Sequence, residues 1–188
     1  MPHTFAKTMF SEASKQLQRQ HGSRATYERM AEAGTRDQEL GLQEIEFIAE
    51  RDSFYLATVT PDGWPYIQHR GGRTGFLKAL DERTLAFADY SGNKQYITTG
   101  NLATNDRVAL FLMDYPNQTR LKIIGHARVV QPGTEAELES RLFDAKEKAP
   151  IERIFVIDVV GFDWNCSQYI TPRYSQQEIQ EHFPQIRD

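Results

Sequence analysis

Two short segments of the chain carry residues that could bind an anion. The first, QHRGGRTGFLK at residues 68–78, places Arg70, Arg73 and Lys78 among glycines. A guanidinium group matches two phosphate oxygens at once, and glycine lets backbone N–H groups approach a flat ligand. A glycine bulge flanked by solvated charges would show the same pattern, so this segment alone leaves both interpretations open.

The second segment is DYSGNKQ at residues 89–95, directly after the apolar run TLAFA. It combines a hydroxyl, a glycine, an amide and an ammonium group just before a short helix predicted over residues 95–99 and ended by Gly100. Because the start of a helix has unpaired N–H donors, such a corner can bind an anion. The alternative is a polar turn that caps the helix. Together, the two segments predict a phosphate-binding corner.

Other familiar catalytic motifs are missing from the sequence. The five histidines are scattered, there is a single cysteine and no HExxH motif, so we expect no metal site. The sequence also lacks GxSxG, GxxxxGK and GxGxxG, which argues against a hydrolase, a nucleoside triphosphatase and a dinucleotide-binding fold. Cys166 has no basic neighbour to activate it and is expected to be a small buried residue.

Short strands must position these segments. Between Phe54 and Val130, apolar runs rich in aromatic and β-branched residues alternate with tight turns. TPDG at residues 60–63 and DERT at residues 81–84 each join two neighbouring runs. Such short turns join antiparallel strands, because a parallel crossover needs about a dozen residues or more. The pattern predicts a small antiparallel barrel.

The 188 residues are expected to form a single domain. We predict N-terminal helices over residues 1–52 and a split barrel over residues 53–164. The barrel contains an inserted helix at about residues 134–148, capped by Thr134. Residues 165–188 form a C-terminal tail with a short helix. The fold class is therefore mainly β with peripheral helices (α+β).

The formal net charge of −4 provides no basic field to hold nucleic acid or an anionic membrane. No run approaches the roughly 20 apolar residues that span a bilayer, and the N-terminus lacks the pattern of a signal peptide. We therefore predict a cytoplasmic protein without nucleic-acid or membrane partners. An anionic ligand must then be bound by local groups.

Four pieces of the sequence occur in an order that resembles a known family. WPYIQHRGG, FLKALDERTLAFAD, YSGNKQ and TRLKIIGHARVV are similar to the flavin-binding split barrel of the pyridoxamine 5'-phosphate oxidase-like family. The resemblance covers about residues 44–130, with weaker agreement over residues 164–174. It implies an antiparallel split barrel, FMN as cofactor, and a homodimer with the cofactor at the interface.

The resemblance also implies which residues hold the FMN phosphate. The basic strand contributes Arg70 or Arg73, and the pattern does not decide between them. The family's phosphate corner is a hydroxyl or amide residue followed by two basic residues. Here Asn93 and Lys94 are followed by the neutral Gln95, so one charge of the corner is missing.

Further positions are implied for the rest of the cofactor. Arg120 and Lys122 resemble residues that contact the flavin ring. Trp164 either covers the ring across the dimer or anchors the tail on the barrel. The cofactor-binding residues expected from the resemblance are His69, Arg70, Gly71, Arg73, Lys78, Asp89, Ser91, Asn93, Lys94, Gln95, Arg120 and Trp164. No catalytic residue is assigned.

The chain departs from the oxidases themselves at two places. Ala88 and Asp89 replace an aromatic and a hydroxyl residue beside the flavin, and the C-terminal segment lacks the Arg-x-His that holds pyridoxamine phosphate. We expect an FMN-dependent oxidoreductase acting on a small organic molecule or on a nicotinamide or flavin, and not on pyridoxamine 5'-phosphate. A non-catalytic flavin sensor or storage protein remains an alternative. So does a haem or deazaflavin binder on the same barrel.

Overall fold

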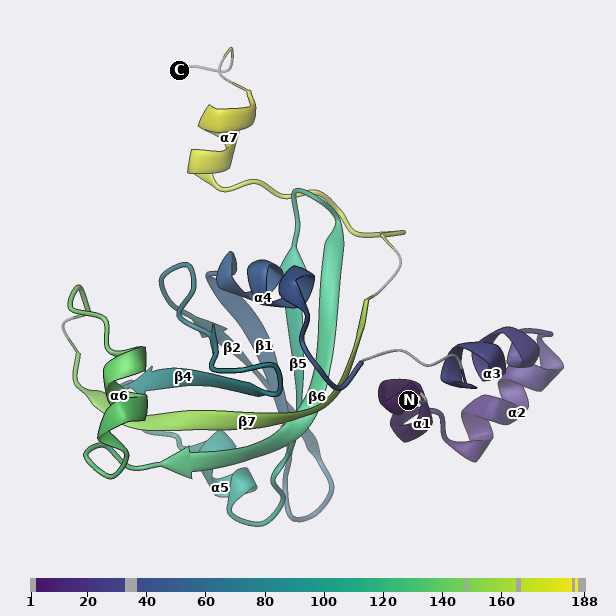
Figure 1. Cartoon of the computed structure of the whole chain (residues 1–188), viewed down its shortest axis with the longest axis horizontal. Helices are drawn as coiled ribbons and strands as arrows, with labels where there is room; N and C mark the ends of the chain where they lie inside the picture. The colour runs from purple at the N-terminus through teal and green to yellow at the C-terminus, as the bar shows by residue number, and fades with distance from the viewer. Residues whose placement is uncertain (1–2, 33–36, 148, 165–166, 184, 186–188) are drawn as a thin grey trace.

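The computed structural model describes residues 3–32, 37–147, 149–164, 167–183 and 185. One antiparallel sheet of seven strands, in the order β2-β1-β5-β6-β7-β4-β3, curls around the core (Figure 1). The strands are β1 (Ser53–Val59), β2 (Pro65–Gly71), β3 (Lys78–Ala79), β4 (Thr84–Tyr90), β5 (Arg107–Asp114), β6 (Thr119–Val130) and β7 (Ile151–Trp164). Because β2 and β3 are edge strands, the barrel is split, as predicted.

The two predicted turns form hairpins. In the first, the Thr60 N–H donates to the Trp64 carbonyl at 2.9 Å, and Gly63 takes the positive φ that the reversal requires. In the second, the Leu80 N–H donates to the Thr84 carbonyl at 2.8 Å. These local reversals place β1 beside β2 and β3 beside β4.

The core lies inside the curl of the sheet and is built on the two longest strands. Leu121 and Ile123 of β6 and Phe155 and Ile157 of β7 are fully buried there. The two strands shift register at Gly125, where an added Cβ would lie 2.5 Å from the Asp158 carbonyl oxygen. The close approach of the two backbones at this bulge therefore requires glycine.

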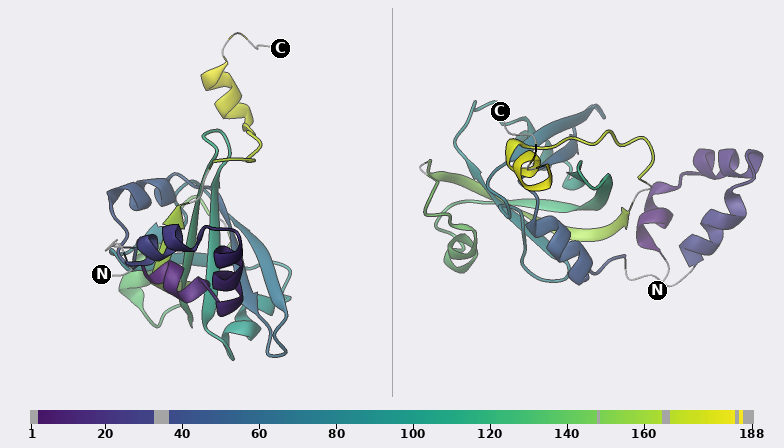
Figure 2. Two further views of the ribbon diagram at one scale, coloured as in Figure 1. Left: turned by 90° about the vertical axis from the view of Figure 1, so that its right-hand side faces the viewer. Right: turned by 90° about the horizontal axis from the view of Figure 1, so that it is seen from above.

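Some helices pack against the sheet and others extend away from it (Figures 1 and 2). The helices are α1 (Thr4–Met9), α2 (Glu12–Gln20), α3 (Arg24–Glu32), α4 (Leu42–Ala49), α5 (Ile97–Leu102), α6 (Ala136–Leu142) and α7 (Gln176–His182). Ser11 caps α2 and Ser175 caps α7 with their side-chain oxygens. α4 places Phe47 and Ile48 in the core, whereas α2 and α3 lie away from the sheet, and α7 projects from another side (Figures 1 and 2).

Two helix predictions were wrong in detail. α6 covers only Ala136–Leu142, and Thr134 does not cap it, because its hydroxyl donates to the Gln131 carbonyl within a turn. α5 does not end at Gly100, whose N–H donates to the Tyr96 carbonyl at 2.8 Å as in a continuing helix. Asn101 explains the longer α5, because its amide donates to the buried Thr58 hydroxyl at 2.9 Å.

Candidate functional site

The open side of the barrel holds a polar cavity of about 280 Å³. Strand β2 contributes alternate residues ending at Arg70, β4 contributes Asp89, and β7 contributes Glu152 and Arg153. The loop that leads from β4 to α5, at residues 92–96, completes the wall. The cavity therefore gathers charged groups from three strands and one loop at the split of the barrel.

A single carboxylate lies between two guanidinium groups in this cavity. Nη1 of Arg70 donates to Oδ1 of Asp89 at 2.7 Å, and Nη1 of Arg153 lies 3.7 Å from Oδ2 of the same residue. Asp89 and Arg153 are also direct partners in the register of β4 and β7. Arg153 further pairs with Glu152 at 2.8 Å and donates to the Thr99 hydroxyl at 2.9 Å.

The guanidinium group of Arg70 is largely shielded from solvent. It lies 5.2 Å from the ring centre of Phe155 and 5.8 Å from that of Phe87, which gives cation–π contacts. Burial lowers the pKa of Arg70, an effect opposed by the charge of Asp89. Burial likewise raises the pKa of Asp89, against the attraction of Arg70 and Arg153. Within the described residues, the buried Nε of Arg70 has no hydrogen-bond partner.

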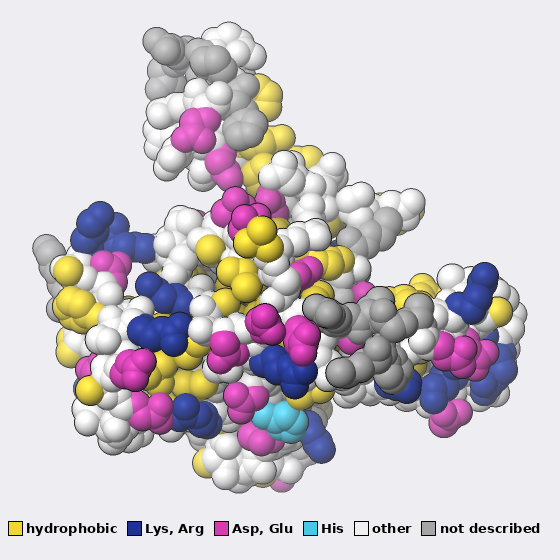
Figure 3. Space-filling model, in the orientation of Figure 1, with side chains coloured by type: hydrophobic (Ala, Val, Ile, Leu, Met, Phe, Trp, Pro, Cys, Tyr) yellow, Lys and Arg dark blue, Asp and Glu magenta, His cyan; other side chains and the backbone are white. Residues whose placement is uncertain are grey.

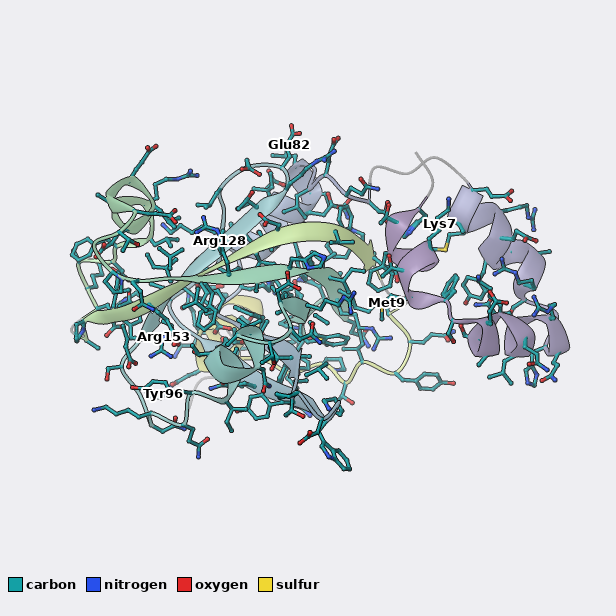
Figure 4. All side chains as sticks on the ribbon, turned by 90° about the horizontal axis from the view of Figure 1, so that it is seen from below. Lys7, Met9, Glu82, Tyr96, Arg128 and Arg153 are labelled. Carbon is teal, nitrogen blue, oxygen red and sulfur yellow. The ribbon has the colours of Figure 1, made fainter. Side chains whose placement is uncertain are left out.

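The loop over the cavity is held in an uncommon conformation. Lys94 and Tyr96 both have positive φ, at 59° and 54°, which costs energy for residues other than glycine. The Asn93 side chain accepts a hydrogen bond from the Gln95 N–H at 3.1 Å. Tyr96 donates its hydroxyl to Glu152 at 2.6 Å. The guanidinium group of Arg153 lies 4.6 Å from the centre of the Tyr96 ring, and Figure 4 shows these two side chains next to each other. Asn93, Lys94 and Gln95 are exposed to solvent and line the cavity.

Three of the expected basic-segment residues lie elsewhere. Gly71, Arg73 and Lys78 line a second cavity of about 280 Å³. Arg73 is exposed there and pairs with Asp144 at 3.3 Å. Tyr90 lines both cavities, so the two adjoin each other. The structure thus separates the two arginines that the sequence left equivalent, with Arg70 inside the split and Arg73 on the surface.

Arg120 lies in a third place, on the outer face of the sheet. It lines an apolar groove of about 650 Å³ together with Tyr55, Ile67 and Lys122. Its buried Nε has no partner within the described residues, and its guanidinium lies 6.0 Å from the ring centre of Phe111. Lys122 is paired with an aspartate of β7 at 2.8 Å.

The remaining expected residues are separate from the polar cavity or exposed. His69 is exposed on the outer face of β2, with its ring 5.6 Å from that of Tyr55, and Ser91 is exposed in the loop.

Trp164 packs edge-on against Phe47 at 4.8 Å and donates its indole N–H to Glu44 at 2.7 Å. Within one chain, Trp164 therefore anchors the end of β7 on α4. Cys166 lies outside the described residues.

Sequence reasoning missed Arg153 and Glu152, although one signal was available. β7 alternates so that Arg153 shares a face with the core residues Phe155 and Ile157. A charged residue at an inward position of an apolar strand needs a partner, and it identifies the strand as one wall of a polar site.

Residues 43–162 match the family described as pyridoxamine 5'-phosphate oxidase. The chain belongs to this family. Among solved structures, HupZ of Group A Streptococcus has a TM-score of 0.54 at 16% identity, over 72% of this chain and 100% of that one. A candidate pyridoxamine 5'-phosphate oxidase of Lactobacillus delbrueckii has a TM-score of 0.52 at 21% identity, over 67% and 94%.

At these identities, the two structures establish the pyridoxamine 5'-phosphate oxidase fold and nothing finer. The sequence matches none of the curated proteins. Within the described residues, no three His, Cys, Asp or Glu side chains group so as to hold a metal ion, and no helix is long and apolar enough to cross a membrane. Basic and acidic side chains are interspersed over the face seen in Figure 3.

Proposed function

We propose that this member of the family is an FMN-dependent oxidoreductase whose polar cavity binds the FMN phosphate. The observation that carries the proposal is the pair of arginines in the split of the barrel, the buried Arg153 and the largely buried Arg70, whose Nε is unsatisfied within the described residues. Buried guanidinium donors suit a phosphate group, which accepts several charge-assisted hydrogen bonds. The donor set of the cavity therefore fits the phosphate end of FMN.

Residues of the cavity would bind the phosphate, and residues of the outer groove would contact the flavin ring. Arg70 and Lys94 neutralise the phosphate, and the Asn93 amide adds a neutral donor at the mouth of the cavity. Arg120 on the outer groove faces the flavin ring, where a positive charge stabilises an anionic reduced ring. FMN itself supplies hydride transfer, and the protein positions it and shields it from water.

The arrangement also supports a homodimer. Arg70 points to the inner face of β2, whereas Ile67 lies in the groove on the outer face together with Arg120, because successive strand residues alternate. The phosphate cavity and the ring groove of one chain therefore lie on opposite faces of β2. We propose that one FMN uses the cavity of one chain and the groove of a second.

A charge placed in the groove is expected to break the dimer. Ile67 is 63% exposed within one chain, so Ile67→Arg should leave the fold intact while placing a cation on the proposed interface. We expect the variant to elute as a monomer, with its midpoint of urea unfolding little changed, whereas the control Trp64→Arg on the hairpin should remain dimeric. Light scattering measures the molecular mass of both variants, and urea denaturation measures their stability. A dimeric Ile67→Arg variant would contradict this interface.

The purified protein tests the cofactor directly. We expect a yellow protein whose ligand, released by heat, has the mass of FMN, and whose visible bands bleach anaerobically with NADH or NADPH. Bound flavin that no reductant bleaches would indicate a storage or sensor protein. An intense Soret band or the mass of a deazaflavin would replace FMN by one of those cofactors. A colourless protein that stays empty after soaking in FMN would refute the proposal.

A further inference from the structure

The position of Asp89 is unexpected in a site that binds an anion. Its two carboxylate oxygens face different arginines, Arg70 at 2.7 Å and Arg153 at 3.7 Å. A phosphate bridging two guanidinium groups would use the same donors. The side chain of Asp89 is only 17% exposed, so water screens this arrangement weakly. The carboxylate therefore stands where the ligand's negative charge would lie.

We propose that Asp89 is an internal counter-anion for these arginines, and that binding of a phosphate group in the cavity is coupled to protonation of Asp89. The inference rests on the proposed function in one respect, the assignment of the phosphate to this cavity. Neutral Asp89 removes the repulsion and leaves an O–H that can donate to a phosphate oxygen. Asp89 thereby regulates how tightly the site binds anions.

The charged groups around Asp89 favour this coupling. β2 contributes Arg70 and the Tyr66 hydroxyl, β7 contributes Arg153 and Glu152, and the loop contributes Lys94 and Tyr96. The cavity thus sets three cations against two carboxylates, so its surplus positive charge is small while Asp89 is ionised. Burial and the negative charge of Glu152 already raise the pKa of Asp89 in the unliganded site. A dianion beside it raises that pKa further.

The sign of the pH effect follows from linkage. Because the pKa of Asp89 is higher with phosphate bound, binding takes up a proton and the affinity rises as the pH falls toward that pKa. The phosphate has the opposite effect, because its second ionisation lies near pH 6 and the monoanion is held less tightly. The net proton count near this pH is therefore the sum of uptake by Asp89 and release by the phosphate.

The first test compares two aspartates that each pair with an arginine. Asp89→Asn is the test, and Asp144→Asn, which removes the exposed partner of Arg73, is the matched control. Binding of FMN and of inorganic phosphate is measured by calorimetry between pH 6 and pH 8. We expect Asp89→Asn to bind both anions about tenfold more tightly at pH 8, the effect of one pKa unit. Asp144→Asn should bind like the unaltered protein.

The second test counts protons. At pH 6.5, in buffers of different ionisation enthalpy, the unaltered protein should take up more protons, or release fewer, than Asp89→Asn when either anion binds. The same proton count in the two proteins, or unchanged affinity in a folded Asp89→Asn variant, would overturn the inference while leaving FMN binding intact. Failure of FMN to bind, with phosphate showing both effects, would refute the proposed function alone. If neither anion binds to the unaltered protein or to Asp89→Asn, both proposals fail.

Discussion

Replacing Arg70 by alanine is expected to release FMN and to destabilise the fold. The affinity for FMN should fall at least about 100-fold, because hydrogen bonds to charged groups contribute about 1.5–3 kcal/mol each. The free energy of unfolding should fall by about 3–5 kcal/mol, because the largely buried Asp89 would lose its partner at 2.7 Å. Fluorescence titration with FMN and urea denaturation measure the two effects.

Arg73 provides the matched control for Arg70. Its side chain is 58% exposed and its pairing with Asp144 at 3.3 Å is a surface interaction. Such pairs contribute at most about 1 kcal/mol, so Arg73→Ala should change the free energy of unfolding little. FMN retained in Arg70→Ala and lost in Arg73→Ala would move the phosphate to the adjoining cavity lined by Gly71 and Lys78.

Truncation of Phe155 is expected to destabilise the protein as strongly. The ring is fully buried, lies 5.0 Å from the stacked ring of Phe87, and contacts the guanidinium of Arg70. Phe155→Ala should lower the free energy of unfolding by about 3–5 kcal/mol, because it removes buried apolar surface and leaves a cavity. The midpoint of urea unfolding, followed by circular dichroism, measures the change.

Phe143 is the control for this truncation. Its side chain is 64% exposed beside the end of α6, so Phe143→Ala should shift the free energy of unfolding by less than about 0.5 kcal/mol. We also expect Phe155→Ala to weaken FMN binding, since the support under Arg70 is lost. A Phe155→Ala protein as stable as the Phe143→Ala protein would contradict the packing of Phe155 against Phe87.

The parts of the fold that the sequence predicted correctly are set by local chemistry. The turn after β1 contains Pro61 and Gly63, and the alternation along β7 buries Phe155 and Ile157 on one face. These patterns act within a few residues, so they can be read without the structure. The ends of α5 and α6 were wrong because distant contacts decide them, such as the bond from Asn101 to Thr58.

The candidate site was predictable only in part for the same reason. Asn93, Lys94 and Gln95 form a local corner whose residue types indicate anion binding. The choice between Arg70 and Arg73 depends on the register of β2, which pairs Arg70 with Phe54 and turns its side chain inward. Arg153 enters the cavity through the pairing of β7 with β4, a contact that spans more than sixty positions of the chain. No short motif carries that information.

The attachment of Trp164 to α4 has a practical consequence for spectroscopy. The chain has two tryptophans, and Trp64 is 73% exposed on the hairpin, so its emission is already that of an indole in water. Trp164 lies against Phe47 with its indole N–H bonded to Glu44. A red shift of the intrinsic emission therefore reports that the end of β7 has come away from α4, and it reports this independently of the residues at the split.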